Sequence, residues 1–484
     1  MLVGLEGLKV KGDLEQEMKG IENNSKKVKK GYLFVAIKGF DVDGHQYIGS
    51  AIEKGATAVM IEEGCDIKAL AIPEGITIVM AKNTREALAI CSSNFYGNPS
   101  RKFKLIGVTG TKGKTTTTFM IKEILEKAGK KVGLIGTIAT YINGKKEKES
   151  DRTTPESIEL QRLFAQMVEA GVEAVVMEVS SQSLKLHRVD GCEFDIVVFT
   201  NFSEDHISPK EHPDMEDYFQ SKLKLFQMCK TGITNNDDLY GAKIPKLFPD
   251  SNIVTYGIDN FANNLAKDIT ITNSYVDFKA KITDRNERIK TGIPGRFSVY
   301  NSLAAICVAQ KFGITPEVVK EALVEVRVPG RSELVDNKKE IPIMIDYAHS
   351  PESLENILQA VKSYTRGRVI SVFGCGGDRD SGKRPIMGEI SGRIADFTFI
   401  TSDNPRTEDP KKIVEQIEEG MKKTKGKYQV VVDRTEAIKE AIKMANKRDI
   451  IVLAGKGHEP YQEIKGKKYP FDERIIVNEI IDNL

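Results

Sequence analysis

The residues best suited to chemistry form a short run of glycines, threonines and lysines between two apolar segments. The run reads Gly107-Val-Thr-Gly-Thr-Lys-Gly-Lys-Thr-Thr-Thr-Thr118, and apolar side chains at helical spacing follow it. Glycines allow backbone N–H groups to approach phosphate oxygens closely, and a helix N-terminus adds partial positive charge. The pattern therefore predicts a strand, a phosphate-binding loop and a helix that bind ATP or GTP.

This loop departs from the strict G-x-x-x-x-G-K-[ST] pattern, because the position of the first glycine falls on Val108. Lys114 and Thr115 still stand where a lysine and a hydroxyl reach the terminal phosphates and a Mg²⁺ ion. A glycine-rich turn without a ligand is the alternative, and the agreement of strand, loop, Lys-Thr pair and helix argues against it. The expected nucleotide contacts are Gly110, Thr111, Lys112, Gly113, Lys114, Thr115 and Thr116.

Composition narrows the class of protein. At about 150 residues per domain, a chain of 484 residues suggests three domains. It has 71 Lys and Arg against 69 Asp and Glu, whereas a nucleic-acid binder would show a basic excess. The six cysteines are scattered without a C-x-x-C pair, which favours reduced thiols over zinc or disulfides. The start lacks an apolar leader and no apolar run reaches about 18 residues, so we expect a cytoplasmic protein with no membrane or nucleic-acid partner.

The apolar pattern predicts an α/β fold in three parts. Residues 1–98 form a small mixed module, and residues 99–330 and 331–484 each alternate strand-like apolar runs with amphipathic helices. This rhythm is typical of mostly parallel sheets that are covered on both faces, in which ligands gather at the carboxyl ends of the strands. The strand-like runs lie at 32–37, 58–61, 105–108, 132–135, 174–177, 196–199, 343–345, 369–373, 397–400 and 450–453.

A series of further motifs resembles the Mur ligase family, and those of the last part resemble the members that add diaminopimelate. The resemblance implies a central P-loop ATPase-like domain, a Rossmann-like C-terminal domain and a cytoplasmic step of peptidoglycan synthesis. The motifs are Thr153-Thr-Pro155, Glu178-Val-Ser-Ser181, His187-Arg-Val189, Asp205-His206, Tyr218-x-x-x-Lys222, Pro329-Gly-Arg331, Asp346-Tyr-Ala-His349, Gly374-Cys-Gly-Gly-Asp-Arg379, Asp403-Asn-Pro-Arg406 and Gly455-Lys-Gly-His-Glu459.

The chemistry that this resemblance implies is an ATP-dependent amide ligation. ATP activates the D-glutamate carboxylate of UDP-N-acetylmuramoyl-L-alanyl-D-glutamate as an acyl phosphate, which the amine of meso-diaminopimelate attacks. Two anions meet in this step, so lysine and Mg²⁺ are needed together. The resemblance makes Lys114, Glu178, His206, Lys222 and Arg331 the catalytic residues. The implied metal site comprises Thr115, Glu178, His206 and Lys222.

Lys222 matches the family lysine that carries a carbamate formed from CO₂, an N6-carboxylysine. Taken by itself it is a lysine in a lysine-rich helix, for which a solvated face is the ordinary interpretation. For ATP, the resemblance places Asn301 near adenine, Arg331 near the terminal phosphate and Asp346 near the ribose. The implied contacts of the UDP-muramyl dipeptide are Ser25, Thr153, Thr154, Ser180 and Arg188, although Leu186 stands where some relatives have Gln.

The Asp403-Asn-Pro-Arg406 motif bears on which amine is added. A guanidinium grips a carboxylate through two parallel hydrogen bonds, and the distal end of diaminopimelate carries a carboxylate whereas lysine ends in an ammonium. The expected diaminopimelate contacts are Arg379, Asp403, Asn404, Pro405, Arg406, Gly455 and Glu459. A lysine-adding Mur ligase, a folylpolyglutamate synthase-like ligase and a nucleotide-switched binding protein remain alternatives. We expect a monomer.

Overall fold

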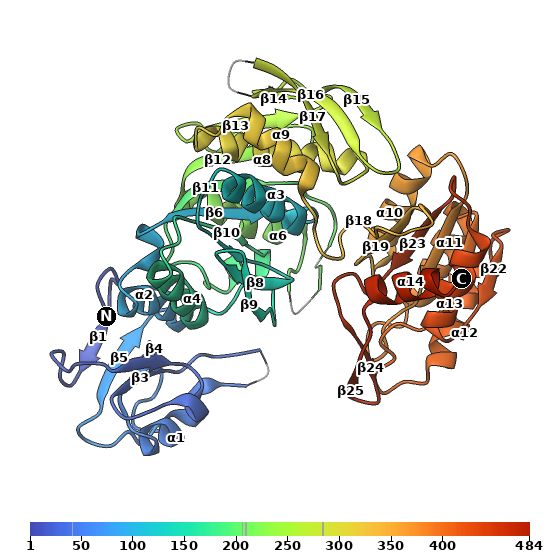
Figure 1. The fold of residues 1–484 in the computed structure, drawn as a ribbon. Coiled ribbons are helices and arrows are strands. Elements are labelled where there is room, and N and C mark those ends of the chain that lie inside the picture. The colour runs from blue at the N-terminus through green and yellow to red at the C-terminus, as the bar shows by residue number, and fades with distance from the viewer. Residues whose placement is uncertain (41, 206, 209–210, 283–284) are drawn as a thin grey trace. The chain divides into compact units, whose positions relative to one another are not determined.

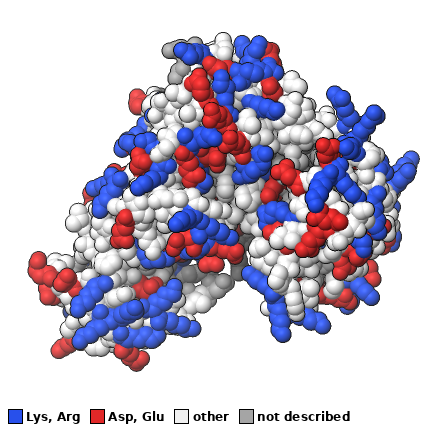
Figure 2. Space-filling view, viewed as in Figure 1, with Lys and Arg blue, Asp and Glu red and all other residues white. Residues whose placement is uncertain are grey.

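The computed structural model describes residues 1–484 except 41, 206, 209–210 and 283–284. The described chain divides into two compact units: Met1–Asn264 with Ala304–Gly313, and Leu265–Leu303 with Ile314–Leu484. Each unit is described by itself. No helix in the described part of the chain is long and apolar enough to cross a membrane. On the face shown in Figure 2, basic and acidic side chains are interspersed, in line with their near-equal numbers.

The first unit begins with a sheet in the order β1-β5-β4-β3-β2. Side chains alternate between its faces, as the pleat requires. Leu33 and Val35 pack against α2 on one face, whereas Phe34 packs against α1 on the other. The elements are β1 (Lys9–Lys11), β2 (Gly20–Glu22), β3 (Tyr32–Val35), α1 (Ile48–Glu53), β4 (Ala56–Glu62), β5 (Thr77–Ala81) and α2 (Thr84–Phe95).

The larger sheet of this unit runs in the order β13-β12-β11-β6-β10-β7-β8-β9. Its strands are parallel from β13 to β7, and β8 and β9 form an antiparallel edge. The strands are β6 (Lys104–Thr109), β7 (Val132–Ile135), β8 (Ala139–Ile142), β9 (Lys145–Glu149), β10 (Ala174–Glu178), β11 (Phe194–Phe199), β12 (Cys229–Asn235) and β13 (Asn252–Gly257). The chain leaves the unit through β14 (Asn264–Leu265).

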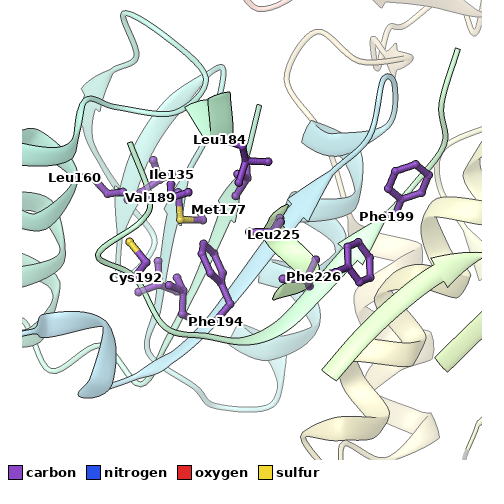
Figure 3. Packing of buried hydrophobic residues seen from close by; sticks show 14 of the residues in the cluster. Ile135, Leu160, Met177, Leu184, Val189, Cys192, Phe194, Phe199, Leu225 and Phe226 are labelled. Carbon is purple, nitrogen blue, oxygen red and sulfur yellow. The ribbon is translucent and has the colours of Figure 1, made fainter. Parts of the chain in front are cut away.

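Helices cover both faces of this sheet, and the core between them is apolar. Met177 of β10 packs with Leu160 of α4 on one face, together with Phe194 and Phe199 of β11 (Figure 3). On the other face, α3 contacts β6, β7 and β10. The helices are α3 (Lys114–Lys127), α4 (Ser157–Glu169), α5 (Ser181–Lys185), α6 (Met215–Leu223) and α7 (Ile244–Leu247).

The second unit contains a small antiparallel sheet and a larger one (Figure 1). The small sheet comprises β15 (Lys267–Ile271), β16 (Val276–Ile282) and β17 (Arg285–Thr291), with α9 (Pro316–Glu325) against β17. Helix α8 (Arg296–Lys311) belongs to this unit up to Leu303 and to the first unit from Ala304.

The larger sheet has the order β18-β19-β23-β20-β21-β22 and is parallel apart from β18. Helices α10, α11 and α12 cover one face, and α13 and α14 cover the other. The strands are β18 (Glu333–Leu334), β19 (Ile343–Asp346), β20 (Val369–Phe373), β21 (Phe397–Ile400), β22 (Tyr428–Val430) and β23 (Ile450–Ala454), followed by the hairpin β24 (Tyr461–Ile464) and β25 (Lys467–Pro470). The helices are α10 (Pro351–Tyr364), α11 (Lys383–Ile394), α12 (Pro410–Met421), α13 (Arg434–Met444) and α14 (Glu473–Asp482).

Candidate active site

The glycine-rich loop connects the central strand β6 to α3, as the sequence predicts. Gly110 and Gly113 have φ values of +139° and +83°, which side chains other than glycine rarely adopt. A Cβ on Gly110 would lie 2.0 Å from Thr200 Oγ1. Asn201 holds the loop from outside, since its carbonyl accepts from Thr111 N at 2.9 Å and its Oδ1 accepts from Lys112 N at 2.9 Å. The loop is therefore held by the segment that follows the neighbouring strand β11.

The end of the loop has the features of an anion site. Gly113 is the N-cap of α3 and makes no side-chain cap hydrogen bond, and the N-terminus of a helix carries partial positive charge. Lys114 Nζ donates to the carbonyls of Gly110 at 2.9 Å and Thr111 at 3.0 Å, which folds its side chain back over the loop. A lysine ammonium and a helix N-terminus thus lie together where a phosphate would lie.

Glu178 ends strand β10 beside the loop and is almost fully buried, with 1% of its surface exposed. Its carboxylate accepts hydrogen bonds from Thr115 Oγ1 at 3.1 Å, Thr137 N at 2.9 Å and Thr137 Oγ1 at 3.0 Å. Charge-assisted bonds of this kind hold a buried carboxylate in place. The structure therefore brings together two residues of the predicted metal site, Thr115 and Glu178. Thr137 has no place in any motif and was not predicted.

Lys222 lies on α6 and is buried, with 1% of its surface exposed, whereas Lys224 is exposed. Its Nζ donates to Gly110 O at 3.0 Å and lies 4.5 Å from the centre of the Tyr218 ring. Burial, and then the Lys114 ammonium, hold the pKa of the Lys222 amine well below its usual range, against an opposite effect of Asp205. The side chain thus points into the loop and is no part of a solvated helix face.

The predicted metal ligand His206 lies outside the described residues. Its neighbour Asp205 is described and forms an ion pair with Lys112 Nζ at 3.0 Å. Within the described part of the chain, no group of three or more His, Cys, Asp and Glu residues is arranged to hold a metal ion. The described oxygens at this site are the hydroxyl of Thr115 and the carboxylate of Glu178, and oxygen donors are those that Mg²⁺ prefers.

Four of the predicted muramyl-substrate residues meet beside Glu178. Thr154 Oγ1 donates to Glu178 O at 2.9 Å and accepts from Ser180 N at 3.1 Å. Arg188 Nη1 donates to Thr154 O at 3.3 Å, and Thr153 Oγ1 lies 3.1 Å from Thr137 Oγ1. The fifth, Ser25, lies elsewhere in this unit, in the turn Ser25–Lys27, where its carbonyl accepts from Lys54 Nζ at 3.3 Å.

A helix-ending turn orients Arg188. His187 has a φ of +56°, and Arg188 N donates to Ser183 O at 2.8 Å, so α5 ends in a left-handed cap usually occupied by glycine. The His187 ring compensates through contacts at 2.5 Å with Asp190 Oδ2 and at 3.1 Å with Asn83 Nδ2. Asn83 also caps α2. The turn before Arg188 is therefore tied to the N-terminal module, and sequence spacing does not reveal that link.

In the second unit, Arg331 and Asp346 lie close together. Asp346 ends β19 and accepts from Ser332 N at 2.7 Å and Ala348 N at 2.9 Å. Burial raises the pKa of its carboxyl, an effect that Arg331 and these hydrogen bonds oppose. The Arg331 guanidinium carbon lies 4.8 Å from the centre of the Tyr347 ring. Asn301 is buried in α8.

The predicted diaminopimelate residues gather at the carboxyl ends of β20, β21 and β23. A Cβ on Gly455 would lie 2.5 Å from Asp403 Oδ2, so these two segments touch. Asn404 Nδ2 donates to Glu459 Oε2 at 2.8 Å, and the buried Lys456 Nζ donates to Asn404 Oδ1 at 3.0 Å. Lys456 lies within a predicted motif, but no spacing rule singled it out.

Two arginines flank Gly376 in the same region. A Cβ on Gly376 would lie 2.9 Å from Arg406 Nη1 and 3.8 Å from Arg379 Cγ. Arg406 Nη1 donates to Gly377 O at 2.7 Å, and its Nε lies 3.3 Å from Glu463 Oε2. The carbonyl of Pro405 packs closely on Gly377. The Arg406 guanidinium is therefore held in place on one side while 22% of its side chain stays exposed.

Comparison with known proteins gives the family of this chain. Three family models match the chain: "Mur ligase family, catalytic domain" over residues 17–96, "Mur ligase middle domain" over 108–309, and "Mur ligase, glutamate ligase domain" over 330–457. The chain belongs to the Mur ligase family. Its α/β fold with N-terminal, middle and C-terminal Mur ligase domains agrees with the sequence prediction.

Relatives in this family align over nearly the whole chain. A protein of Caldanaerobacter subterraneus subsp. tengcongensis, named UDP-N-acetylmuramoyl-L-alanyl-D-glutamate--2,6-diaminopimelate ligase, is 50% identical over 99% of this chain and 98% of its own length. A Clostridium botulinum protein of the same name is 47% identical over 97% of this chain and 96% of its own length. A solved structure of such a ligase has a TM-score of 0.72 at 29% identity, covering 97% of this chain and 95% of the other.

Structures of more distant proteins share the fold. MurF from Thermotoga maritima, solved in complex with ADP, has a TM-score of 0.59 at 19% identity and covers 96% of this chain and 97% of its own. Folylpolyglutamate synthase of Mycobacterium tuberculosis, complexed with ADP and AMPPCP, has a TM-score of 0.60 at 16% identity, with 77% and 92% covered. At these identities the likeness is one of fold alone.

Proposed function

We propose that this Mur ligase joins meso-diaminopimelate to the D-glutamate of UDP-N-acetylmuramoyl-L-alanyl-D-glutamate at the expense of ATP, a cytoplasmic step of peptidoglycan synthesis carried out by a monomer. The observation that carries the proposal is the constellation at the strand ends of the second unit. It combines the oriented guanidinium of Arg406 with the carboxylate of Glu459, one for each charge on the distal end of diaminopimelate. The names of the full-length relatives point the same way.

The remaining N–H donors of Arg406 indicate how it would bind the distal carboxylate of diaminopimelate. Among the described residues, Glu463 and Gly377 O take one each of its five N–H groups, which leaves three for a substrate carboxylate. Arg379 is exposed beside it and can take a second carboxylate. Lysine as substrate would present an ammonium to Arg406, which disfavours binding. This argument favours diaminopimelate over the lysine-adding and folate-type alternatives.

For the second substrate, ATP, the residues of the glycine-rich loop would hold and orient the phosphates. Asn201 holds the N–H groups of Thr111 and Lys112, so other N–H groups within Gly110–Thr116 and the Lys114 ammonium would bind phosphate oxygens. These contacts would draw negative charge off the γ-phosphate as the glutamate carboxylate attacks it. Thr115 and Glu178 are the described residues that would hold Mg²⁺, and the metal when bound would screen the two anions from each other. By family resemblance His206 completes this set.

We also assign an N6-carboxylysine to Lys222. Among the described residues its ammonium has no ion-pair partner, although it is buried and Lys114 lies near. In its neutral form the amine nitrogen can attack the carbon of CO₂, forming a C–N bond and releasing one proton. The product is a carbamate with one negative charge, which would suit both Lys114 and a metal ion.

The remaining parts of the proposal concern organisation and substrates. We divide the chain into a UDP-sugar-binding domain at 1–98, an ATP-binding domain at 99–330 and an amino-acid-binding domain at 331–484. The cluster of Thr153, Thr154, Ser180 and Arg188 would bind the muramyl dipeptide, and its direct hydrogen bond to Glu178 O keeps it next to the site of phosphoryl transfer. Asn301, Arg331 and Asp346 would contact ATP.

The test is phosphate release by the purified protein with Mg-ATP and UDP-N-acetylmuramoyl-L-alanyl-D-glutamate. Parallel reactions contain meso-diaminopimelate, L-lysine or no amine, and the products are weighed by mass spectrometry. We expect turnover with diaminopimelate only. Turnover with lysine alone would overturn the specificity argument, and phosphate release that ignores both amine and muramyl substrate would favour a nucleotide-switched binding protein.

A further inference from the structure

A buried ion pair lies beneath the strand ends that carry the proposed diaminopimelate residues. Arg434 and Glu473 are 1% and 2% exposed, and Arg434 Nε donates to Glu473 Oε1 at 2.8 Å. They are the first residues of α13 and α14, two helices that pack on the same face of the sheet. Neither residue belongs to a motif that the sequence singles out.

The Arg434 guanidinium also holds two backbone carbonyls. Its Nη2 donates to Ala454 O at 2.9 Å, and its Nη1 lies 3.5 Å from Ser402 O, at the long limit of a hydrogen bond. Ala454 directly precedes Gly455, and Ser402 directly precedes Asp403. One guanidinium therefore contacts the residue that directly precedes each of the two segments from which diaminopimelate contacts are expected.

The two segments come from strands that are not neighbours. Strand β20 lies between β21, which leads to Ser402, and β23, which ends at Ala454. Sheet hydrogen bonds therefore do not fix the one against the other directly. A planar guanidinium with donors in a fixed fork sets the spacing between two such carbonyls, and a flexible ammonium does not.

The position of Arg434 is unfavourable for its own helix. A cation in the first turn opposes the helix dipole, and a buried charge needs a partner to offset its lost hydration. Glu473 supplies that partner, and its own place at the N-terminus of α14 suits a carboxylate. Such a loss of local helix stability is expected where a residue is needed for a functional site.

We propose that Arg434, neutralised by Glu473, is a positioning residue for the amino-acid site. It fixes the spacing of the Asp403–Arg406 and Gly455–Glu459 segments and so the match of the site to diaminopimelate. This inference rests on the proposed function. Its kinetic signature is a selective effect on the amino acid, since ATP and the muramyl substrate are bound by other residues.

Two variants test this role without leaving a lone buried charge. Arg434→Lys keeps the ion pair but loses the fork, and the double variant Arg434→Met with Glu473→Leu replaces the pair by apolar side chains, which buried pairs often tolerate. For both we expect the KM for diaminopimelate to rise about tenfold, while kcat and the KM for ATP stay within about threefold.

The matched control is Arg368→Lys. Arg368, whose side chain is 44% exposed, pairs with the buried Asp449 at 2.7 Å and donates to Met444 O at 2.8 Å, so it makes the same kinds of contact at the amino ends of the strands of this sheet. We expect its KM for diaminopimelate to be unchanged. If the Arg434 variants fold and keep the wild-type KM, or if the control shows the same rise, the positioning role is overturned.

Hydrogen exchange gives a second readout that needs no substrate. The amides of Ser402 and Gly455 donate to Val432 O at 3.1 Å and Asp346 O at 3.0 Å, so they report the order of the two segments. We expect about tenfold faster exchange of both in Arg434→Lys and no change in Arg368→Lys. If the wild-type protein fails to use diaminopimelate, the proposed function fails, but the exchange measurement still tests the positioning role. Equal exchange rates in Arg434→Lys and Arg368→Lys would reject that role.

Discussion

Arg406→Lys gives the sharpest test of how the amine is recognised. The wild-type guanidinium keeps three N–H groups for a carboxylate, and Gly377 O and Glu463 hold it in place. Lysine retains the charge but loses the fork, so one of two parallel charge-assisted hydrogen bonds to the substrate is lost. Such a bond contributes about 1.5–3 kcal/mol. Since 22% of the side chain is exposed, we expect the lower half of this range, a fall in kcat/KM of about 10- to 50-fold.

The assay is amine-dependent phosphate release over a range of diaminopimelate concentrations, with ATP and muramyl substrate saturating. The fall should appear in KM for diaminopimelate, while the KM for ATP is unchanged. Arg393→Lys is the matched control, because its side chain is 54% exposed near the end of α11 and its ion pairs within the described residues are with carboxylates at 3.7 and 3.9 Å. Equal losses in both variants, or an equal rise in the KM for ATP, would refute the reasoning.

Three other perturbations follow from the geometry. Lys222→Ala should lower turnover at least about hundredfold, and acetate or formate should restore part of it by replacing the carbamate charge. Gly330→Ala should abolish most turnover, because its Cβ would lie 2.1 Å from His458 N, whereas Gly313→Ala, with a similar φ but open space, should not. Burial lowers the pKa of His212 from 6.5, so the unfolded state binds more protons below that pH; stability should fall as pH drops from about 6.5, and less so in His212→Asn.

Each of these has a control and a contrary result. Lys224→Ala, in an exposed neighbour of Lys222, should keep full activity, and full activity of Lys222→Ala without rescue would contradict the carbamate assignment. For Gly330, the stabilities of both glycine variants are measured by unfolding followed by circular dichroism. An alanine at either position adds backbone strain, whereas only the alanine at Gly330 also adds a clash, so the difference between the two variants gives the effect of the clash. For His212, equal acid sensitivity of variant and wild type in the same unfolding assay would reject the assignment.

Much of the fold was predictable because its signals are local. The predicted strand 196–199 is found within Phe194–Phe199, and the helix after the loop begins at Lys114. The order of strands was not predictable, because no local pattern states that β6 lies between β10 and β11. Residues Val276–Ile282 alternate apolar and charged side chains, a signal from which that strand was predictable.

The site divides in the same way. Motifs identify residues that we propose share a ligand, such as Thr115 and Glu178, and the structure brings these two together. Motifs do not identify the residues that hold them, such as Thr137 or Arg434, since those contacts join segments distant in sequence whose spacing follows no rule. Physical chemistry recovers them only once burial and hydrogen-bond partners are known.

Two buried basic side chains, one in each unit, differ in the partners that surround them, and this difference favours a structural role for one and a chemical role for the other. Arg434 has a buried carboxylate partner and two carbonyls, so its charge is offset and its geometry fixed. Lys222 has one carbonyl, an aromatic ring and a neighbouring lysine, and no ion pair among the described residues. A buried charge that a carboxylate neutralises, such as that of Arg434, can act only by positioning its neighbours. A buried amine left without an offset costs stability, and conversion to a carbamate removes that cost by reversing the sign of the charge beside Lys114. The same physical argument therefore supports both proposals, the positioning role of Arg434 and the carbamate on Lys222.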